Sequence, residues 1–206
     1  MTEMSTLEII EKGKKIITLE SESLIRVKER IDESFAKAVE MIHDCTGKII
    51  ITGTGKSGLI GRKIAATMSC CDIPCLFLNA YETENGDLGV VRENDLIIVI
   101  SNSGETDILK HLVVPSCKSL GCEIIVLTGN LTSTLGKESD VALNVGVERE
   151  ACPLNLNASS STTATLAVGD ALALTAMERR GTTREKFYFL HQGGAWGKTL
   201  KEEFKK

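Results

Sequence analysis

Paired cysteine motifs are absent from this sequence of 206 residues. Its seven cysteines are an odd number, and they form neither a CxxC pair nor a cluster with histidine. A disulfide framework and a zinc knuckle both need such spacing, so neither is expected, and no metal site is predicted. Unpaired cysteines are typical of a reducing compartment, which predicts a cytoplasmic location.

Long runs of basic or apolar residues are also absent. The formal net charge is −4, and no run of lysine and arginine is interleaved with aromatic residues, which argues against nucleic acid as a partner. No uncharged apolar stretch approaches the roughly 20 residues that cross a membrane. Residues 1–10 carry Glu3 and Glu8 in place of the basic start and apolar run of a signal peptide. We therefore expect neither a membrane nor a nucleic-acid partner.

The sequence alternates between helical stretches and short apolar runs. Apolar residues recur at helical spacing through residues 6–45 and predict a helical segment with a break near Gly13, while Ser5 and Glu8 predict a capping box at its start. From residue 46 onward, β-branched runs alternate with helices, which is typical of a parallel sheet covered on both faces. We expect a helical segment at 1–45 and one α/β domain at 46–206. The predicted strands lie at residues 48–52, 75–78, 95–100, 123–127 and 141–145.

The first polar loop, residues 53–58, reads Gly-Thr-Gly-Lys-Ser-Gly; it follows a predicted strand and opens a predicted helix. Backbone N–H groups at a helix N-terminus favour an anion, so Gly55, Lys56 and Ser57 are candidate ligands. A dinucleotide site would need an acidic residue at the end of the next strand, where Asn79 stands. A Walker A loop also fails, because its leading glycine would fall on an isoleucine. By itself, the loop predicts only an anion site.

The second polar loop, residues 101–106, reads Ser-Asn-Ser-Gly-Glu-Thr and follows the most apolar predicted strand. Ligands of open parallel sheets bind beyond the carboxyl ends of the strands, and a phosphate needs several donors with little steric bulk. An ordinary helix cap needs one hydroxyl residue, whereas this turn carries three. We therefore predict that it binds a phosphate through Ser101, Asn102, Ser103 and Thr106.

Two further residues are candidates for proton transfer. Glu150 lies in an Arg-Glu-Ala-Cys-Pro loop after the fifth predicted strand, and a carboxylate is the usual base for moving a proton between neighbouring carbons. His191 precedes two glycines, which permit close approach of the backbone, and histidine exchanges protons near neutral pH. A glutamate in a loop is more often solvated than catalytic, so Glu150 alone predicts little.

Together and in this order, these elements resemble the arabinose-5-phosphate isomerases of the SIS (sugar isomerase) family. The SxSGET element is common to all SIS proteins, whereas the REACP and HxGG elements narrow the resemblance to this branch. The resemblance extends from about residue 47 to residue 200. The phrases that carry it lie at residues 55–67, 86–89, 101–106, 149–154, 160–167, 169–173 and 191–195.

The resemblance implies a SIS fold, a three-layer sandwich around a five-stranded parallel sheet, and a homotetramer with composite sites. It implies catalytic roles for Lys56, Glu105, Glu150 and His191, with Glu105 orienting Lys56 rather than reacting. One departure is Asn85, which stands before Gly-Asp-Leu-Gly where the family usually has a histidine. Another departure is that many members continue into a pair of CBS domains, whereas this sequence stops after residue 206.

The expected function is interconversion of arabinose 5-phosphate and ribulose 5-phosphate through an enediol. Glu150 would act as the base for the proton that moves between C1 and C2. His191, from a neighbouring subunit, would assist ring opening and proton transfer between O1 and O2, and Lys56 would stabilise negative charge on oxygen. No metal or organic cofactor is needed, and the expected partner is a small sugar phosphate. Two alternatives stay open because the phosphate end is common to all candidates. One is another SIS isomerase, acting on a hexulose or heptulose phosphate; the other is a SIS module that binds a sugar phosphate without turnover.

Overall fold

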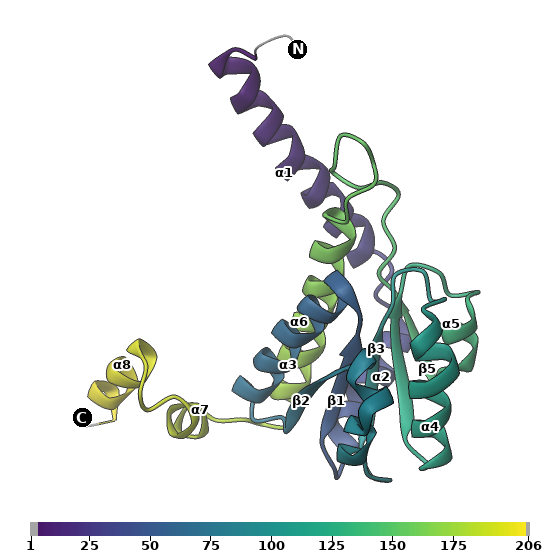
Figure 1. The fold of residues 1–206 in the computed structure, drawn as a ribbon. Helices are drawn as coiled ribbons and strands as arrows, with labels where there is room; N and C mark the ends of the chain where they lie inside the picture. The colour runs from purple at the N-terminus through teal and green to yellow at the C-terminus, as the bar shows by residue number, and fades with distance from the viewer. Residues whose placement is uncertain (1–3, 205–206) are drawn as a thin grey trace.

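The central sheet has five parallel strands in the computed structural model, which describes residues 4–204 (Figure 1). This confirms the predicted parallel sheet, and the strand order is β2-β1-β3-β4-β5. Gly53 pairs with Asn79 and with Ile100, so the carboxyl ends of the first three strands lie at one edge. The strands are β1 (Ile49–Gly53), β2 (Cys75–Asn79), β3 (Leu96–Ile100), β4 (Glu123–Thr128) and β5 (Val141–Asn144).

Helices cover both faces of the sheet, which confirms the expected three-layer sandwich (Figure 1). One face is covered by α1 (Thr6–Lys28), α2 (Glu33–Asp44), α3 (Gly55–Cys70) and α6 (Ser160–Arg179). The other face is covered by shorter elements: the 3-10 helices η1 (Ala80–Asn85) and η2 (Asp87–Val90), the π-helix η3 (Leu109–Val113), α4 (Val114–Ser119) and α5 (Thr134–Glu138).

Side chains alternate along the strands between two apolar clusters. Ile49 and Ile51 face the layer of α3 and α6, whereas Ile50 faces the layer of α4, and none of the three is more than 1% exposed. Full burial of such a side chain stabilises the fold by roughly 1.5–3 kcal/mol. Since both faces are buried, the strands are apolar at nearly every position, which is the pattern that predicted them.

The N-terminal segment forms two helices with well-defined caps. The predicted capping box is confirmed: the Glu8 N–H donates to Ser5 Oγ over 3.3 Å, and the Ser5 N–H donates to Glu8 Oε2 over 2.8 Å. The predicted break near Gly13 is wrong, because α1 continues through this residue. A single glycine costs a helix only about 1 kcal/mol. The break lies after Lys28, where Asp32 caps α2 by accepting a hydrogen bond from the Ser34 N–H (2.9 Å).

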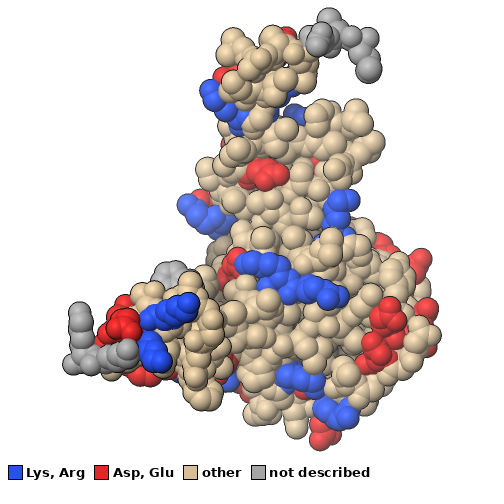
Figure 2. Space-filling view, turned by 60° about the vertical axis from the view of Figure 1, so that its left-hand side comes forward, with Lys and Arg blue, Asp and Glu red and all other residues tan. Residues whose placement is uncertain are grey.

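The two N-terminal helices differ in how they meet the domain. Ala38 and Ile42 of α2 are fully buried in the core that α6 also enters. The first half of α1 projects from the domain, with Leu7, Ile9 and Ile10 exposed (Figure 1). In Figure 2 this arm is mostly tan, and charged groups of both signs are scattered over the face shown. The division of the chain at residue 45 stays a prediction.

The C-terminal helices α7 (Arg184–Leu190) and α8 (Ala195–Glu203) form an extension beside the domain (Figure 1). They follow the far end of α6, opposite the helix end that lies near the carboxyl ends of the strands. An apolar cavity of about 290 Å³ separates the extension from α6 and is lined by Met177, Thr182, Thr183, Arg184, Phe187 and Leu200. Between residues 4 and 204, no helix is both long and apolar enough to span a bilayer.

Candidate active site

Three polar segments meet beyond the carboxyl ends of β1 and β3. They are the first polar loop, the second polar loop and the start of α6, and they enclose a small cavity of about 60 Å³. The structure thus brings together the two loops that were predicted to bind an anion. The cavity is lined by Lys56, Ser57, Ile60, Asn102, Ala158, Ser161, Thr162 and Thr165.

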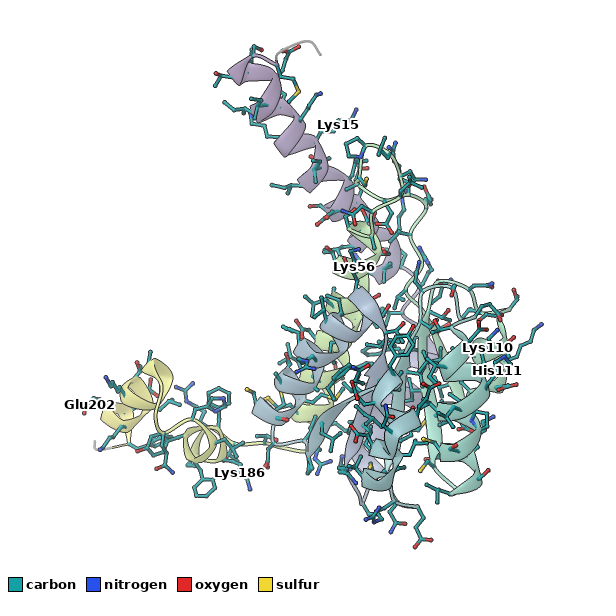
Figure 3. All side chains as sticks on the ribbon, viewed as in Figure 1. Lys15, Lys56, Lys110, His111, Lys186 and Glu202 are labelled. Carbon is teal, nitrogen blue, oxygen red and sulfur yellow. The ribbon has the colours of Figure 1, made fainter. Side chains whose placement is uncertain are left out.

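The first polar loop places a lysine at the mouth of the cavity. Gly55 has a φ of +54° and open space around it, and it starts α3 directly after the strand. Lys56 is exposed, and within residues 4–204 its ammonium group has no hydrogen-bond or ion-pair partner (Figure 3). Ser57 is half-buried beside it. This leaves an unneutralised positive charge and free helix N–H groups at the cavity, which suits an anionic ligand.

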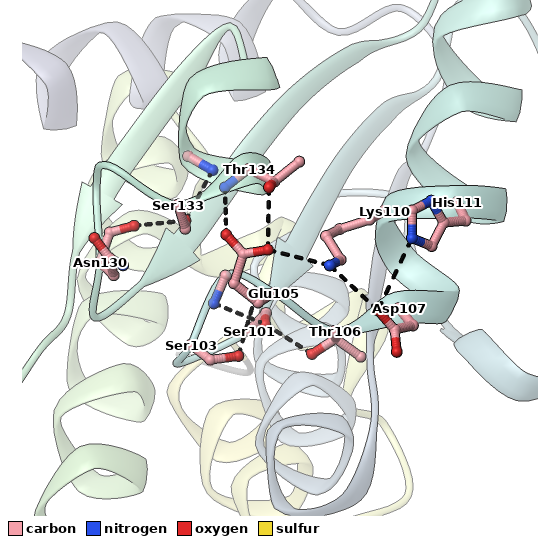
Figure 4. A network of polar contacts seen from close by, with 12 residues as sticks. Ser101, Ser103, Glu105, Thr106, Asp107, Lys110, His111, Asn130, Ser133 and Thr134 are labelled. Atoms are coloured by element: carbon pink, nitrogen blue, oxygen red, sulfur yellow. Dashed lines mark hydrogen bonds and ion pairs between the residues drawn. The ribbon is translucent and has the colours of Figure 1, made fainter.

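The second polar loop is a closed turn held by its own hydroxyl groups (Figure 4). Ser101 is only 2% exposed, and its Oγ lies 2.9 Å from Thr106 Oγ1 and accepts from the Gly104 N–H over 3.1 Å. Ser103 Oγ accepts from the Glu105 N–H over 3.2 Å. Asn102 and Ser103 are exposed at the tip. Ser101 and Thr106 therefore brace the turn from inside, while Asn102 and Ser103 face outward.

Glu105 is engaged on the side of the turn away from Lys56. Its Oε1 accepts from the Thr134 N–H over 2.7 Å, and its Oε2 accepts from Thr134 Oγ1 over 3.0 Å and from Lys110 Nζ over 3.1 Å (Figure 4). The hydrogen bond from the Thr134 backbone and then the one from Lys110 hold the pKa of Glu105 below its usual range. Within residues 4–204 no contact joins Glu105 to Lys56, so the expected orienting role toward Lys56 is not met.

Lys110 was not anticipated from the sequence. It lies on the π-helix η3, and its side chain reaches back five residues to Glu105. The same ammonium group pairs with Asp107 over 3.2 Å, and His111 lies 3.9 Å from that carboxylate (Figure 4). These acidic partners raise the pKa of Lys110, with the hydrogen bond to Glu105 as the largest cause. This network fixes the turn to α5, and nothing in the residue spacing indicates it.

Glu150 lies against the first turn of α6, which lines the cavity. Its Oε2 accepts from the Ser159 N–H over 2.7 Å, from Ser159 Oγ over 3.2 Å and from the Ser161 N–H over 3.2 Å. Burial raises the pKa of this carboxyl, but the hydrogen bonds from Ser161 and Ser159 outweigh it, and the pKa lies below its usual range. Glu150 is therefore ionised at neutral pH, as a base must be.

His191 and Asn85 are not brought to the cavity. His191 follows α7, where its Nδ1 lies 2.8 Å from the Phe187 carbonyl oxygen and its ring stacks on Phe187 with centroids 3.9 Å apart. That extension lies away from the strand ends (Figure 1). Asn85 is exposed at the end of η1, which follows β2. Ser161, Thr162 and Thr165 also line the cavity, and they were not predicted as site residues although their segment is rich in hydroxyl groups.

The donor groups at the cavity suit a sugar phosphate better than a metal ion. Across residues 4–204, no group of three or more histidine, cysteine, aspartate or glutamate side chains is arranged to hold an ion. The groups that line the cavity are one ammonium, one amide and several hydroxyls. Such a set of donors suits the oxygens of a phosphorylated sugar.

Comparisons with known proteins relate these residues to a family and to characterised relatives. The sequence model described as the SIS domain matches residues 41–175. The chain is 41% identical over 200 residues to the arabinose 5-phosphate isomerase KdsD of Pseudomonas aeruginosa strain PAO1, covering 97% of this chain and 61% of that protein. It is 44% identical over 188 residues to KdsD of Escherichia coli strain K12, covering 91% of this chain and 57% of that protein. The chain thus spans about three fifths of the length of these relatives.

A solved structure matches over its whole length. It is the E. coli CFT073 protein c3406 in complex with arabinose 5-phosphate, and it is 36% identical with a TM-score of 0.87. The match covers 91% of this chain and 100% of that chain. The two chains therefore share one fold over about nine tenths of this chain.

Proposed function

Because this chain belongs to the SIS domain family, we propose that it is an aldose–ketose isomerase that interconverts arabinose 5-phosphate and ribulose 5-phosphate. The observation that carries the proposal is the meeting of three groups at one cavity. These are the second polar loop, the ammonium of Lys56 and the start of α6, whose first N–H groups hold the carboxylate of Glu150. The name of the KdsD relatives and the sugar phosphate bound in the solved structure support the choice of substrate.

The phosphate binds at the two polar loops in this proposal. Asn102 and Ser103 at the tip of the second loop, with Ser57 and the backbone N–H groups that start α3, supply the donors. Ser101 and Thr106 keep the turn closed, because their hydroxyls are bonded to one another. The sugar carbons then extend toward the start of α6.

The reaction from aldose to ketose moves the C2 hydrogen to C1 and a hydroxyl proton from O2 to O1, through an enediol(ate). Glu150 takes the proton from C2 and returns it to C1. Lys56 stabilises the negative charge that develops on oxygen, in a site where its ammonium has no competing acidic partner among residues 4–204. This proton transfer needs only acid and base groups, so we propose neither a metal nor an organic cofactor.

Ring opening and the transfer of the proton between O1 and O2 are assigned to His191 of a neighbouring copy of the chain. Within its own chain His191 lies beside the domain, outside the cavity (Figure 1). We propose a homotetramer in which the extension of one subunit completes the site of another. The exposed apolar residues of the α1 arm, such as Leu7, Ile10 and Ile17, support an assembly of this kind, because association would cover them.

The cellular setting follows from the substrate. We propose that the protein works in the cytoplasm, and that its product serves lipopolysaccharide or capsule biosynthesis. Its partner is then a small phosphorylated sugar, with no role for nucleic acid or membrane.

A panel of aldose phosphates tests the proposal. The wild-type chain is incubated with arabinose 5-phosphate and with other pentose and hexose phosphates, and ketose formation is followed by NMR. The expected result is conversion of arabinose 5-phosphate to ribulose 5-phosphate. Conversion of another aldose phosphate in its place would identify a different SIS isomerase. Binding of sugar phosphates without any conversion would identify a binding module and overturn the proposal.

A further inference from the structure

At the start of helix α6, the carboxylate of Glu150 caps the helix in place of the N-cap residue Ser159. Ser159 stands at the N-cap, where a serine normally accepts a hydrogen bond from an N–H of the first turn. Here its side chain makes no such bond to the helix. Instead, its Oγ accepts from the Ala151 N–H over 3.0 Å and donates to Glu150 Oε2 over 3.2 Å.

The carboxylate of Glu150 performs the capping in place of the serine. Its Oε2 accepts from the N–H groups of Ser159 and Ser161 at the start of a helix of 20 residues. Negative charge is favoured at this end of a helix by the free N–H groups and by the helix dipole. The N–H groups of the helix thus bind Oε2 of Glu150, the proposed base. The Ser159 hydroxyl, which does not cap the helix, is available to bind both this carboxylate and the backbone of the loop that carries it.

We propose that Ser159 is a positioning residue, whose hydroxyl clamps the loop of Glu150 and fixes the direction of its carboxylate. The inference rests on the proposed role of Glu150 as the base. A second hydrogen bond also restrains this loop, because the Glu150 N–H donates to Asn155 Oδ1 over 2.7 Å. Asn155 itself has a φ of +53°, which its short polar side chain tolerates.

The pKa of Glu150 can be used to test whether the Ser159 hydroxyl binds its carboxylate, because few charged groups lie nearby. Within residues 4–204 no ion pair reaches the carboxylate, and the causes that lower its pKa are hydrogen bonds from Ser161 and Ser159. On the neighbouring elements, Lys56 of α3 lines the cavity, and Glu20 of α1 accepts a hydrogen bond from Thr163 over 3.1 Å. Arg149 and Cys152 are the nearest titratable residues along the loop itself. None of these is changed by a substitution at Ser159.

The experiment compares Ser159→Ala with wild type and with Ser119→Ala. Ser119 is a matched control because its hydroxyl bonds to the carbonyl oxygen of Pro115 on α4, far along the chain and outside the cavity. The pKa of Glu150 is read by NMR of isotope-labelled glutamate, and the signal is assigned by its loss in Glu150→Gln. In parallel, kcat and KM for arabinose 5-phosphate are measured across pH.

In Ser159→Ala the pKa of Glu150 is expected to rise and the acid limb of the kcat profile to move to higher pH. Loss of one hydrogen bond to a charged group also predicts a fall in kcat of about 10- to 100-fold, while KM changes by less than about threefold because the phosphate turn is intact. Ser119→Ala leaves all of these values at those of wild type.

An unchanged pKa of Glu150 in Ser159→Ala overturns the inference, and so does a raised pKa with an unchanged kcat. The NMR titration needs no turnover, so it separates failure of this inference from failure of the proposed function, which wild type alone would reveal. If Ser159→Ala does not fold, Ser159→Gly removes the same hydroxyl, and glycine is well tolerated at a helix N-cap.

Discussion

Substitution of Gly104 by alanine tests whether the phosphate turn depends on close packing. Gly104 has a φ of +68°, and an added Cβ would lie 1.9 Å from Ser133 Oγ and 2.4 Å from Ser133 Cβ. Ser133 cannot easily move aside, because it is 3% exposed and its hydroxyl makes two hydrogen bonds. It donates to the Asn130 carbonyl oxygen over 2.6 Å and accepts from the Gly136 N–H over 3.2 Å.

Two separate penalties are expected for Gly104→Ala. The left-handed backbone costs an alanine about 1–2 kcal/mol, and an overpacked buried contact typically costs a further 1–3 kcal/mol, for a total of about 2–5 kcal/mol. Gly181 supplies the matched control, since it has the same φ of +68° and nothing within 4 Å of an added Cβ. Gly181→Ala should therefore lose only about 1–2 kcal/mol of the free energy of unfolding.

The assay is urea unfolding of wild type and both variants, followed by the thermal shift that arabinose 5-phosphate gives each protein. Gly104→Ala should be less stable than Gly181→Ala and should lose most of the ligand-induced shift, because the turn must move to make room. Equal stabilities of the two variants would refute the packing explanation. A normal ligand shift in Gly104→Ala would mean that the phosphate does not bind at this turn.

Three further predictions concern the proposed base Glu150, the buried carboxylate of Asp95, and Asn85, which stands where the family usually has a histidine. Glu150→Gln should fold and still bind sugar phosphate, but its kcat should fall by at least about 100-fold. Exchange of the C2 hydrogen with deuterated solvent should slow in parallel, and exchange at the wild-type rate would exclude Glu150 as the base. The Asp95 carboxylate is buried and pairs with the half-buried Lys48 over 2.6 Å; although burial raises its pKa, hydrogen bonds from Lys48 and Arg92 bring the pKa below its usual range. Its stabilising contribution is therefore present above pH 3.8 and is lost as the pH falls through the lowered pKa. Asp95→Asn should cost about 2 kcal/mol near neutral pH in urea unfolding, because hydrogen bonds to a charged group are lost, and the difference from wild type should close in acid; a constant difference would contradict this. Asn85 lies outside the cavity of its own chain, so Asn85→His changes the activity profile between roughly pH 6 and pH 8 only by reaching the site of a neighbouring subunit in the proposed homotetramer. We expect that change, and an identical profile would show that Asn85 faces the reacting carbons of no subunit.

The strands could be predicted from the sequence because burial on both faces leaves a continuous apolar run. Ile49, Ile50 and Ile51 are each at most 1% exposed, so the run has no polar interruption. The break in the N-terminal helices could not be predicted from glycine, because one glycine is tolerated inside α1. It is decided instead by Asp32, whose side chain caps the second helix.

The site was predictable in its chemistry but not in its pairings. The two polar loops converge because the carboxyl ends of parallel strands lie at one edge of the sheet. One partner of Glu105, however, is Thr134, which lies 29 residues away in the chain and contacts it only in the folded structure. The position of His191 could not be predicted either, because its His-Gln-Gly-Gly motif does not indicate that α7 lies beside the domain and away from the strand ends (Figure 1).

The packing of α1 and α2 against α6 sets an order of events during synthesis. The chain must grow by about 130 residues after α1 before α6 exists, although Val27 and Ile42 are buried in the cluster that α6 completes. At about 5–20 residues per second the ribosome needs roughly 10 s for this stretch, whereas apolar segments collapse within about 100 μs. The apolar face of α2 therefore emerges long before its native cover, and during that interval it is a ready binding site for chaperones at the ribosome.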